Sequence, residues 1–137
     1  MPRLVRWYIK TALVYFVAGL VVGVAVALGG PLAVFTAGLM PVYYHLLMVG
    51  WITLLILGVA IWMFPKFSQE QPRGNEKVAW ATYVLLNLGL LLRVIGEPLD
   101  SLSSGSGWGA LLAASAVLEW LGGMLILSIL WRRVKIR

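Results

Sequence analysis

The segment YYHLLMVGWITLLILGVAIWMFPK, residues 43–66, decides the fold of this chain. It is almost wholly apolar, yet it contains His45, the one histidine among 137 residues. A helix rises about 1.5 Å per residue, so roughly 20 consecutive apolar residues are enough to cross a bilayer. The segment therefore predicts a membrane-spanning helix with a single imidazole near one end.

The composition of the whole chain agrees with this prediction. Apolar residues make up 61% of the sequence and charged residues 12%, and the mean hydropathy is +0.93. Soluble domains average about 45–50% apolar residues, so we expect a protein of the lipid bilayer. The absence of cysteine excludes disulfides, thiolate catalysis and iron–sulfur clusters. The net charge of +6 arises beside the apolar runs, which indicates membrane topology and not nucleic-acid binding.

Four apolar runs are long enough to span a membrane, and hydrocarbon offers the backbone no hydrogen-bond partners, so each should be a helix. We place the helices at about 7–28, 42–64, 78–96 and 109–131, in one all-α domain of residues 1–137. The first run is too long for the apolar core of a signal peptide, so we expect it to be retained. Glycine and proline should set the helix ends. These are Gly29-Gly30-Pro31 after the first run, Pro41 in the first turn of the second, Pro65 after it, and Gly96-Glu97-Pro98 at the end of the third.

Lysine and arginine predict the orientation of the helices. Basic residues gather at the N-terminus, in the middle loop and at the C-terminus, whereas the loops at 29–41 and 97–108 contain none. Since cytoplasmic segments of membrane proteins are enriched in these residues, both termini and the middle loop should be cytoplasmic, in a prokaryotic inner membrane. The basic residues are Arg3, Arg6 and Lys10; Lys66, Arg73 and Lys77; and Arg132, Arg133, Lys135 and Arg137.

Ionisable residues at membrane depth are costly, which makes them candidates for function. His45 and Arg93 should each lie about one turn inside the outer end of their helices, so they share a level. Glu119 lies near the middle of the fourth helix, and the uncharged Asn87 near the middle of the third.

Each of these residues has more than one interpretation. His45 is either a haem iron ligand or an interfacial histidine hydrogen-bonded to a neighbour. Arg93 either pairs with a haem propionate or snorkels and pairs with Glu97 one turn on. Glu119 is either a neutral acid hydrogen-bonded to another helix or part of a proton relay.

Small residues favour close helix contacts in membranes. Gly19 and Gly23, followed by Ala27, lie on one face of the first helix and predict such a contact. Gly50 and Gly58 in the second helix leave room either for another helix or for a planar cofactor.

Two segments carry a family resemblance. HLLMVGWITLLILGVAIWMFP, residues 45–65, resembles helix two of haem-copper oxidase catalytic subunits. LNLGLLLRVIGEP, residues 86–98, is similar to the next helix in short subunit I-like relatives of the C-type oxidase and nitric oxide reductase branch. The resemblance covers residues 41–98. It implies that His45 is an axial ligand of a low-spin haem, most simply of b type.

The remaining cofactor contacts stay open at this point. Met48 and Trp51 share the helix of His45 and join Arg93 as candidate cofactor-binding residues. Met48 is poorly placed to reach the opposite face of a haem. Met40, water or a position open to a small gas are the alternatives for the second axial position.

The chain also departs from the family. A complete oxidase needs several further histidines for copper and a second haem, and this chain has only one. We therefore exclude a complete oxidase and expect no copper. Four helices correspond to one arc, a third of the twelve-helix scaffold, so the resemblance implies a homotrimer.

The sequence thus predicts a b-type haem protein for electron transfer or gas binding, with a quinone or a cytochrome as redox partner. The alternatives are a non-catalytic assembly subunit and a small proton-coupled transporter that uses Glu119.

Overall fold

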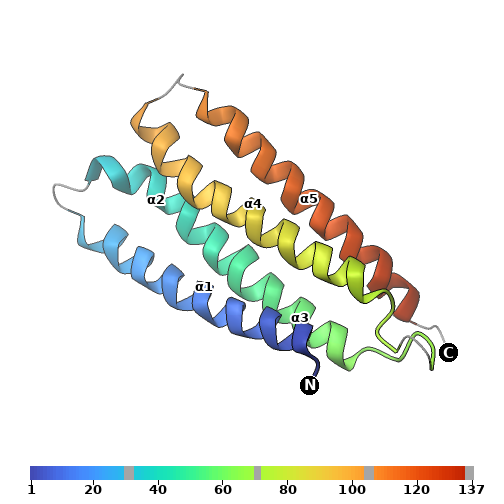
Figure 1. The fold of residues 1–137 in the computed structure, drawn as a ribbon. Coiled ribbons are helices and arrows are strands. Elements are labelled where there is room, and N and C mark those ends of the chain that lie inside the picture. Colours follow the sequence, from blue (N-terminus) through green and yellow to red (C-terminus); the bar gives the residue numbers. More distant parts are fainter. Residues whose placement is uncertain (30–32, 70–71, 104–106, 135–137) are drawn as a thin grey trace.

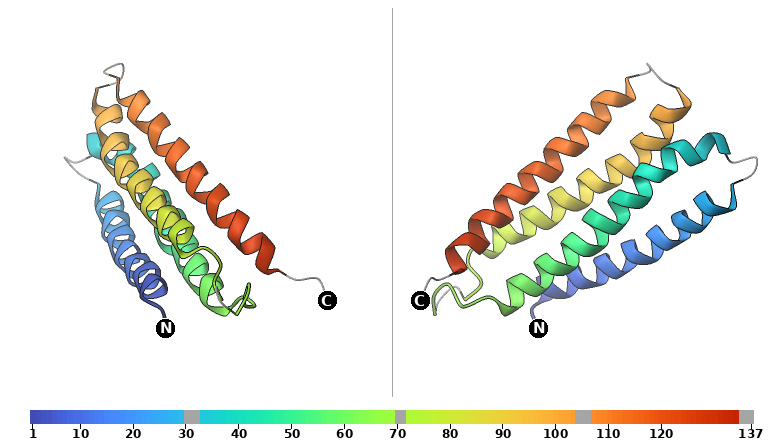
Figure 2. Two further views of the ribbon diagram at one scale, coloured as in Figure 1. Left: turned by 45° about the vertical axis from the view of Figure 1, so that its right-hand side comes forward. Right: turned by 180° about the vertical axis from the view of Figure 1, so that it is seen from behind.

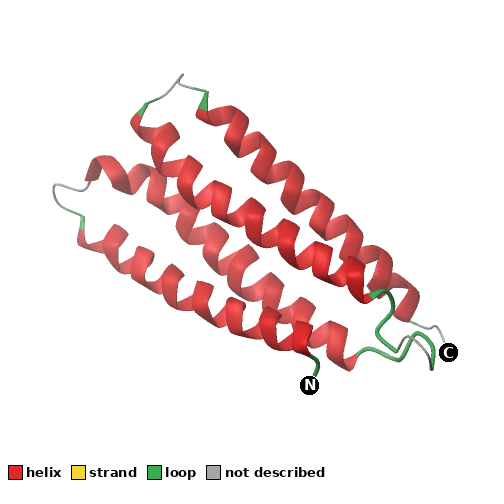
Figure 3. Cartoon of the chain, viewed as in Figure 1, coloured by secondary structure: helices red, strands yellow, loops and turns green. Residues whose placement is uncertain are grey.

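The computed structural model describes residues 1–29, 33–69, 72–103 and 107–134. This part of the chain is helical, with loops between the helices and no strand (Figure 3). The elements are α1 (Arg3–Leu28), α2 (Ala33–His45), the π-helix η2 (Leu46–Thr53), α3 (Leu54–Met63), α4 (Glu76–Leu102) and α5 (Trp108–Arg133). Since α2, η2 and α3 follow one another without a break, the six elements make four long helical rods (Figure 1).

Each rod contains a stretch that is long and apolar enough to cross a membrane. The stretches are 26 or 27 residues long, with mean hydropathies between 1.8 and 2.4. At about 1.5 Å per residue they exceed the roughly 30 Å of a bilayer's hydrocarbon core. The prediction of an all-α fold with four such helices is confirmed, and it indicates an integral membrane protein. The stretches are Arg3–Leu28, Gly38–Met63, Glu76–Leu102 and Trp108–Arg133.

Two predicted helix ends are correct. The first helix ends at Leu28, and Gly29 follows it with a positive φ of 58°. The second rod ends at Met63, and Phe64 is extended (φ −64°, ψ 150°) directly before Pro65. The residue before a proline disfavours the helical region for steric reasons, so this end is set locally. The start of α4 is also local, because the Asn75 side chain accepts a hydrogen bond from the Lys77 amide at 3.0 Å and caps the helix.

Two other predicted ends are wrong, because both helices continue past a proline. The second rod begins at Ala33 and contains Pro41, so Met40 lies in a helix and not in a loop. α4 continues through Pro98 to Leu102. A proline removes only one helical hydrogen bond, and tertiary packing can outweigh that loss. α1 and α5 also begin slightly earlier than predicted, while Gly30, Pro31, Lys135 and Arg137 lie outside the described residues.

The packing that extends these helices is visible at Gly38. A Cβ atom on this buried glycine would lie 2.7 Å from Pro98 Cα and 2.9 Å from the Glu97 carbonyl oxygen. The backbones of α2 and α4 therefore meet directly at this point. The contact holds the part of α2 that precedes Pro41 against α4 at Glu97 and Pro98.

The rods lie side by side in a row. α1 packs on the second rod, α2 packs on α4, and α4 packs along the length of α5 (Figures 1 and 2). α1 begins and α5 ends at the same end of the row, where α3 also ends and α4 begins (Figure 1). At its last turn α5 also reaches α3 through Arg133, whose guanidinium hydrogen-bonds to the Ile61 carbonyl.

The glycines predicted to permit close helix contacts do so within the chain. A Cβ atom on Gly19 would lie 2.7 Å from Leu47 Cδ2, and one on Gly23 would lie 2.8 Å from Tyr43 Cε2. α1 therefore uses this face to pack on the second rod, as predicted. The same contact means that these glycines are not free to join one subunit to another.

The suggestion that Gly50 and Gly58 leave room for a cofactor is wrong. Tyr15 and Leu90 occupy the space beside Gly50, with Tyr15 Cβ 2.8 Å from the position of an added Cβ. Tyr8 Cβ lies 2.9 Å from the corresponding position at Gly58. Side chains of α1 and α4 fill both positions, because close helix packing takes up the space that the missing side chains leave.

Candidate functional site

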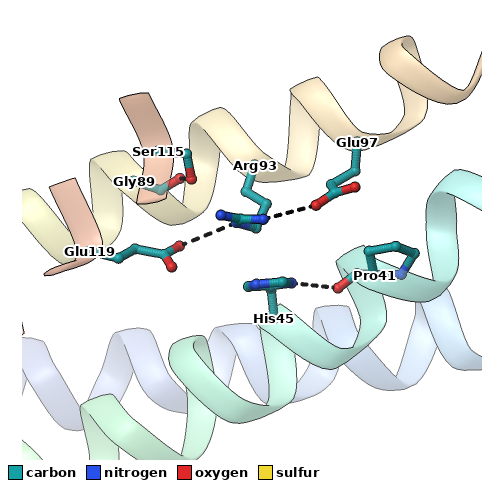
Figure 4. A network of polar contacts seen from close by, with 7 residues as sticks. All are labelled: Pro41, His45, Gly89, Arg93, Glu97, Ser115 and Glu119. Atoms are coloured by element: carbon teal, nitrogen blue, oxygen red, sulfur yellow. Dashed lines mark hydrogen bonds and ion pairs between the residues drawn. The ribbon is translucent and has the colours of Figure 1, made fainter. Parts of the chain in front are cut away.

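His45 and Arg93 lie deeper in their helices than predicted. Twelve helical residues (33–44) precede His45, and nine (94–102) follow Arg93. The placement of each residue one turn from a helix end is therefore wrong. Because both helices are longer at the same end, the two residues still share a level, and their side chains point toward one another from α2 and α4 (Figure 4).

Arg93 is the centre of a group of charged side chains. Its Nη1 donates to Glu97 Oε1 at 3.0 Å, and its Nε lies 3.8 Å from Glu119 Oε1 on α5 (Figure 4). These three side chains are only 15–17% exposed. We call His45, Arg93, Glu97 and Glu119 the polar cluster. The pairing of Arg93 with Glu97, one of the two interpretations from the sequence, is confirmed, and the pairing with Glu119 is new.

The contact between Arg93 and Glu119 is an ion pair without a hydrogen bond. Arg93 Nε and Glu119 Oε1 are both buried, and neither has a hydrogen-bond partner among the described residues. Buried polar atoms in proteins are nearly always hydrogen-bonded, so each exception calls for a reason. A buried carboxyl oxygen and a buried guanidinium N–H with unused hydrogen-bonding capacity suit the binding of a polar ligand atom, and the carboxyl group can also gain or lose a proton.

His45 is held in one orientation by its own helix. Its Nδ1 lies 2.8 Å from the carbonyl oxygen of Pro41. A carbonyl oxygen only accepts, so Nδ1 is the donor, and in the neutral ring this tautomer has its lone pair on Nε2. Histidines that ligate metals are fixed in the same way, by a hydrogen bond from the other ring nitrogen.

The backbone changes its helical type directly after His45. Residues Leu46–Thr53 form the π-helix η2, and the Thr53 hydroxyl donates to the Met48 carbonyl at 2.7 Å within it. π-Helical turns are uncommon and occur frequently at functional sites. The change in winding re-aims the side chains after His45 relative to those before it.

A close approach of two helices positions Glu119. A Cβ atom on Gly89 would lie 2.8 Å from Glu119 Cγ and 3.0 Å from the Ser115 carbonyl oxygen. The buried Ser115 hydroxyl donates to the Gly89 carbonyl at 2.7 Å (Figure 4). Gly89 and Ser115 were not singled out from the sequence. Gly89 lies four residues before Arg93, and Ser115 lies four residues before Glu119. Residues four apart share one face of a helix, so this spacing could have identified both.

The other predicted site residues lie elsewhere. Asn87 accepts from the Tyr15 hydroxyl at 2.8 Å and donates to the Tyr83 carbonyl at 2.7 Å, which ties α4 to α1. Trp51 packs on Phe16 of α1, with ring centroids 4.2 Å apart. Met48 is 58% exposed. Asn87 and Trp51 therefore serve the packing of α1, and Met48 faces outward.

The polar cluster limits the chemistry that the chain can perform. Within the described ranges, no group of three or more His, Cys, Asp or Glu residues is placed to hold a metal ion. The cluster does offer one imidazole, one planar cation and two carboxyl groups. This set can donate one nitrogen ligand, bind an anion or transfer a proton.

Comparison of the chain with protein-family models, with curated proteins and with solved structures finds no match. The geometry of the polar cluster is therefore the basis for a functional proposal.

Proposed function

We propose that this chain is a membrane b-type haem-binding protein, for electron transfer or gas binding, with His45 as an iron ligand. The main support is the hydrogen bond from His45 Nδ1 to the Pro41 carbonyl. It fixes the tautomer that leaves Nε2 as a neutral donor, and neutral imidazole is an effective haem ligand. The donor chemistry of the site therefore fits a haem iron.

Each residue of the polar cluster has a role in this proposal. A bound haem supplies a one-electron redox centre or an iron atom open to a small gas. His45 Nε2 binds the iron. Arg93 pairs with a propionate in place of Glu97, since its planar fork suits carboxylates. Met40, 42% exposed, is a candidate for the second axial position, as are water and an open site. A quinone or a cytochrome is the proposed redox partner.

An absorption spectrum of the purified protein tests this proposal. After expression with ample haem, we expect a Soret band for the wild type and its loss in His45→Ala. Tyr44→Ala is the matched control, because Tyr44 is the exposed neighbour of His45 and should leave the band in place. A wild-type protein without a Soret band excludes the proposal, and so does a His45→Ala variant that keeps one.

The proposal includes an assembly and an orientation. A homotrimer would bring twelve membrane-length helices together, the number in the scaffold that the sequence resembles. A detergent-corrected mass of a monomer or dimer excludes it. We further propose that both termini are cytoplasmic, in a prokaryotic inner membrane. The start of α1, the end of α3, the start of α4 and the end of α5 all lie at one end of the row, and the basic residues gather beside these four points. Single cysteines introduced at either terminus report the orientation, because the chain has no other cysteine.

A second candidate function is proton-coupled transport through Glu119. It is favoured by the ion pair of 3.8 Å between Arg93 and Glu119, whose buried Nε and Oε1 atoms have no hydrogen-bond partner in the described chain. When the Glu119 carboxyl group gains a proton, it loses its negative charge and its attraction to Arg93 on α4. Protonation would therefore change how α5 is held against α4. In proteoliposomes with a pH gradient, Glu119→Gln should abolish substrate-driven proton flux while the Glu76→Gln control keeps it. Equal flux in the two variants excludes this candidate.

A further inference from the structure

The first turns of α1 present a basic face to the outside of the row. Arg3, Arg6, Trp7 and Lys10 line a cavity of about 330 Å³. Their spacing of i, i+3, i+4 and i+7 places them on one side of the helix. All four are exposed, whereas Leu4 and Tyr8 on the opposite side are buried in the core.

The three cations of this basic face have no acidic partners in the described chain. α1 contains no aspartate or glutamate. The two ion pairs of the described residues both involve Arg93, on a different helix. Among the residues that the structure describes, three positive charges therefore surround one cavity without an acidic partner, so the cavity favours an anion.

The depth of the basic face in a bilayer follows from the sequence of α1. Residues 11–28 are uncharged and helical, and 18 residues at about 1.5 Å each span roughly 27 Å. This length matches the hydrocarbon core of about 30 Å, so the residues before 11 reach the headgroup layer. Trp7 agrees with this depth, because tryptophan is enriched where hydrocarbon meets the headgroups.

We propose that the basic face of Arg3, Arg6, Trp7 and Lys10 is a binding site for the phosphate group of an anionic membrane lipid. The phosphate accepts hydrogen bonds from the two guanidinium groups and the ammonium group. The Trp7 ring packs on the glycerol and the upper acyl chain. A zwitterionic lipid offers the same phosphate, but its own ammonium group opposes the three cations, so the site selects lipids with net negative charge.

Native mass spectrometry of the whole purified protein, titrated with phosphatidylglycerol or phosphatidylcholine, tests this site. The variant Arg3→Gln/Arg6→Gln/Lys10→Gln removes the three cations. The matched control Lys66→Gln/Arg73→Gln/Lys77→Gln removes the same charge from the middle loop, at the same end of the molecule. We expect about a fivefold loss of phosphatidylglycerol affinity for a single Arg6→Gln change and more than tenfold for the α1 triple variant. Phosphatidylcholine binding should not change.

Two results would overturn the proposal. One is equal affinity of the wild type for the two lipids. The other is an equal loss of phosphatidylglycerol binding in the α1 and middle-loop variants, which would mean that net charge alone matters. If the α1 triple variant does not fold, the Arg6→Gln variant takes its place. A fivefold loss of its phosphatidylglycerol affinity supports the site, and an unchanged affinity overturns it. None of these readouts depends on haem, so the lipid site and the proposed function fail separately.

Discussion

Arg133→Ala will destabilise the four rods by about 3 kcal/mol or more, whereas Arg132→Ala will leave their stability unchanged. The Arg133 side chain is only 1% exposed although it lies in the last turn of α5. Its guanidinium donates to the carbonyls of Ile61, Phe64 and Pro65 at 3.0, 2.6 and 3.0 Å. These carbonyls end α3, where the helix itself offers no donors.

The loss arises because alanine leaves three carbonyl acceptors without their donor, in one buried and two partly buried hydrogen bonds. Each hydrogen bond from a charged group contributes about 1.5–3 kcal/mol, and an unmade buried one is costly. Arg133→Lys should lie between the wild type and alanine, because an ammonium group cannot match three carbonyls in a planar arrangement. Thermal unfolding in detergent, followed by circular dichroism, measures the differences. Equal melting temperatures for Arg133→Ala and Arg132→Ala would show that the contact does not hold α5 to α3.

Gly38→Ala will also destabilise the protein, by about 2 kcal/mol. The added Cβ would lie 2.7 Å from Pro98 Cα and 2.9 Å from the Glu97 carbonyl oxygen, and both are backbone atoms. Because neither can move like a side chain, α2 and α4 must separate. Alanine has a higher helix propensity than glycine, but that gain of about 1 kcal/mol is smaller than the cost of the overlap.

Gly123→Ala is the matched control for this change. It also adds one methyl group to a helical glycine, but nothing lies within 4 Å of the new Cβ. We expect its melting temperature to equal or slightly exceed that of the wild type, while Gly38→Ala melts earlier. A Gly38→Ala variant as stable as Gly123→Ala would contradict the close approach of α2 and α4. The Arg93–Glu97 pair should loosen in Gly38→Ala, since Glu97 lies at the same contact.

The ends of the helices show where local rules succeed and where they fail. Pro65 ends the second rod because the steric restriction on Phe64 is local and nothing opposes it. Pro41 and Pro98 do not end their helices, because the two segments pack on each other at Gly38. A proline rule applied to one segment contains no information about a partner far away in the sequence. The lengths of α2 and α4 could therefore not be predicted.

The polar cluster was predictable in its members but not in its contacts. Hydropathy alone identifies His45, Arg93 and Glu119, because a charge within an apolar run is visible in the sequence. The pairing of Arg93 with Glu97 follows from their spacing of four residues. The contact of Arg93 with Glu119 depends on the approach of α4 and α5 at Gly89 and Ser115, which no spacing along one helix reveals.

The sequence by itself determined the number of membrane-length helices, their helical nature and the residues that place charge within them. It did so because the bilayer imposes a length and leaves the backbone no partner except itself. Only the tertiary structure decided that Arg133 caps α3. It also decided that side chains of neighbouring helices fill the space beside Gly50 and Gly58. The position of His45, facing Arg93 and Glu119 between the rods, is a further result of the tertiary structure. These features depend on distances between helices, and helix periodicity fixes which face a residue occupies but not what stands opposite.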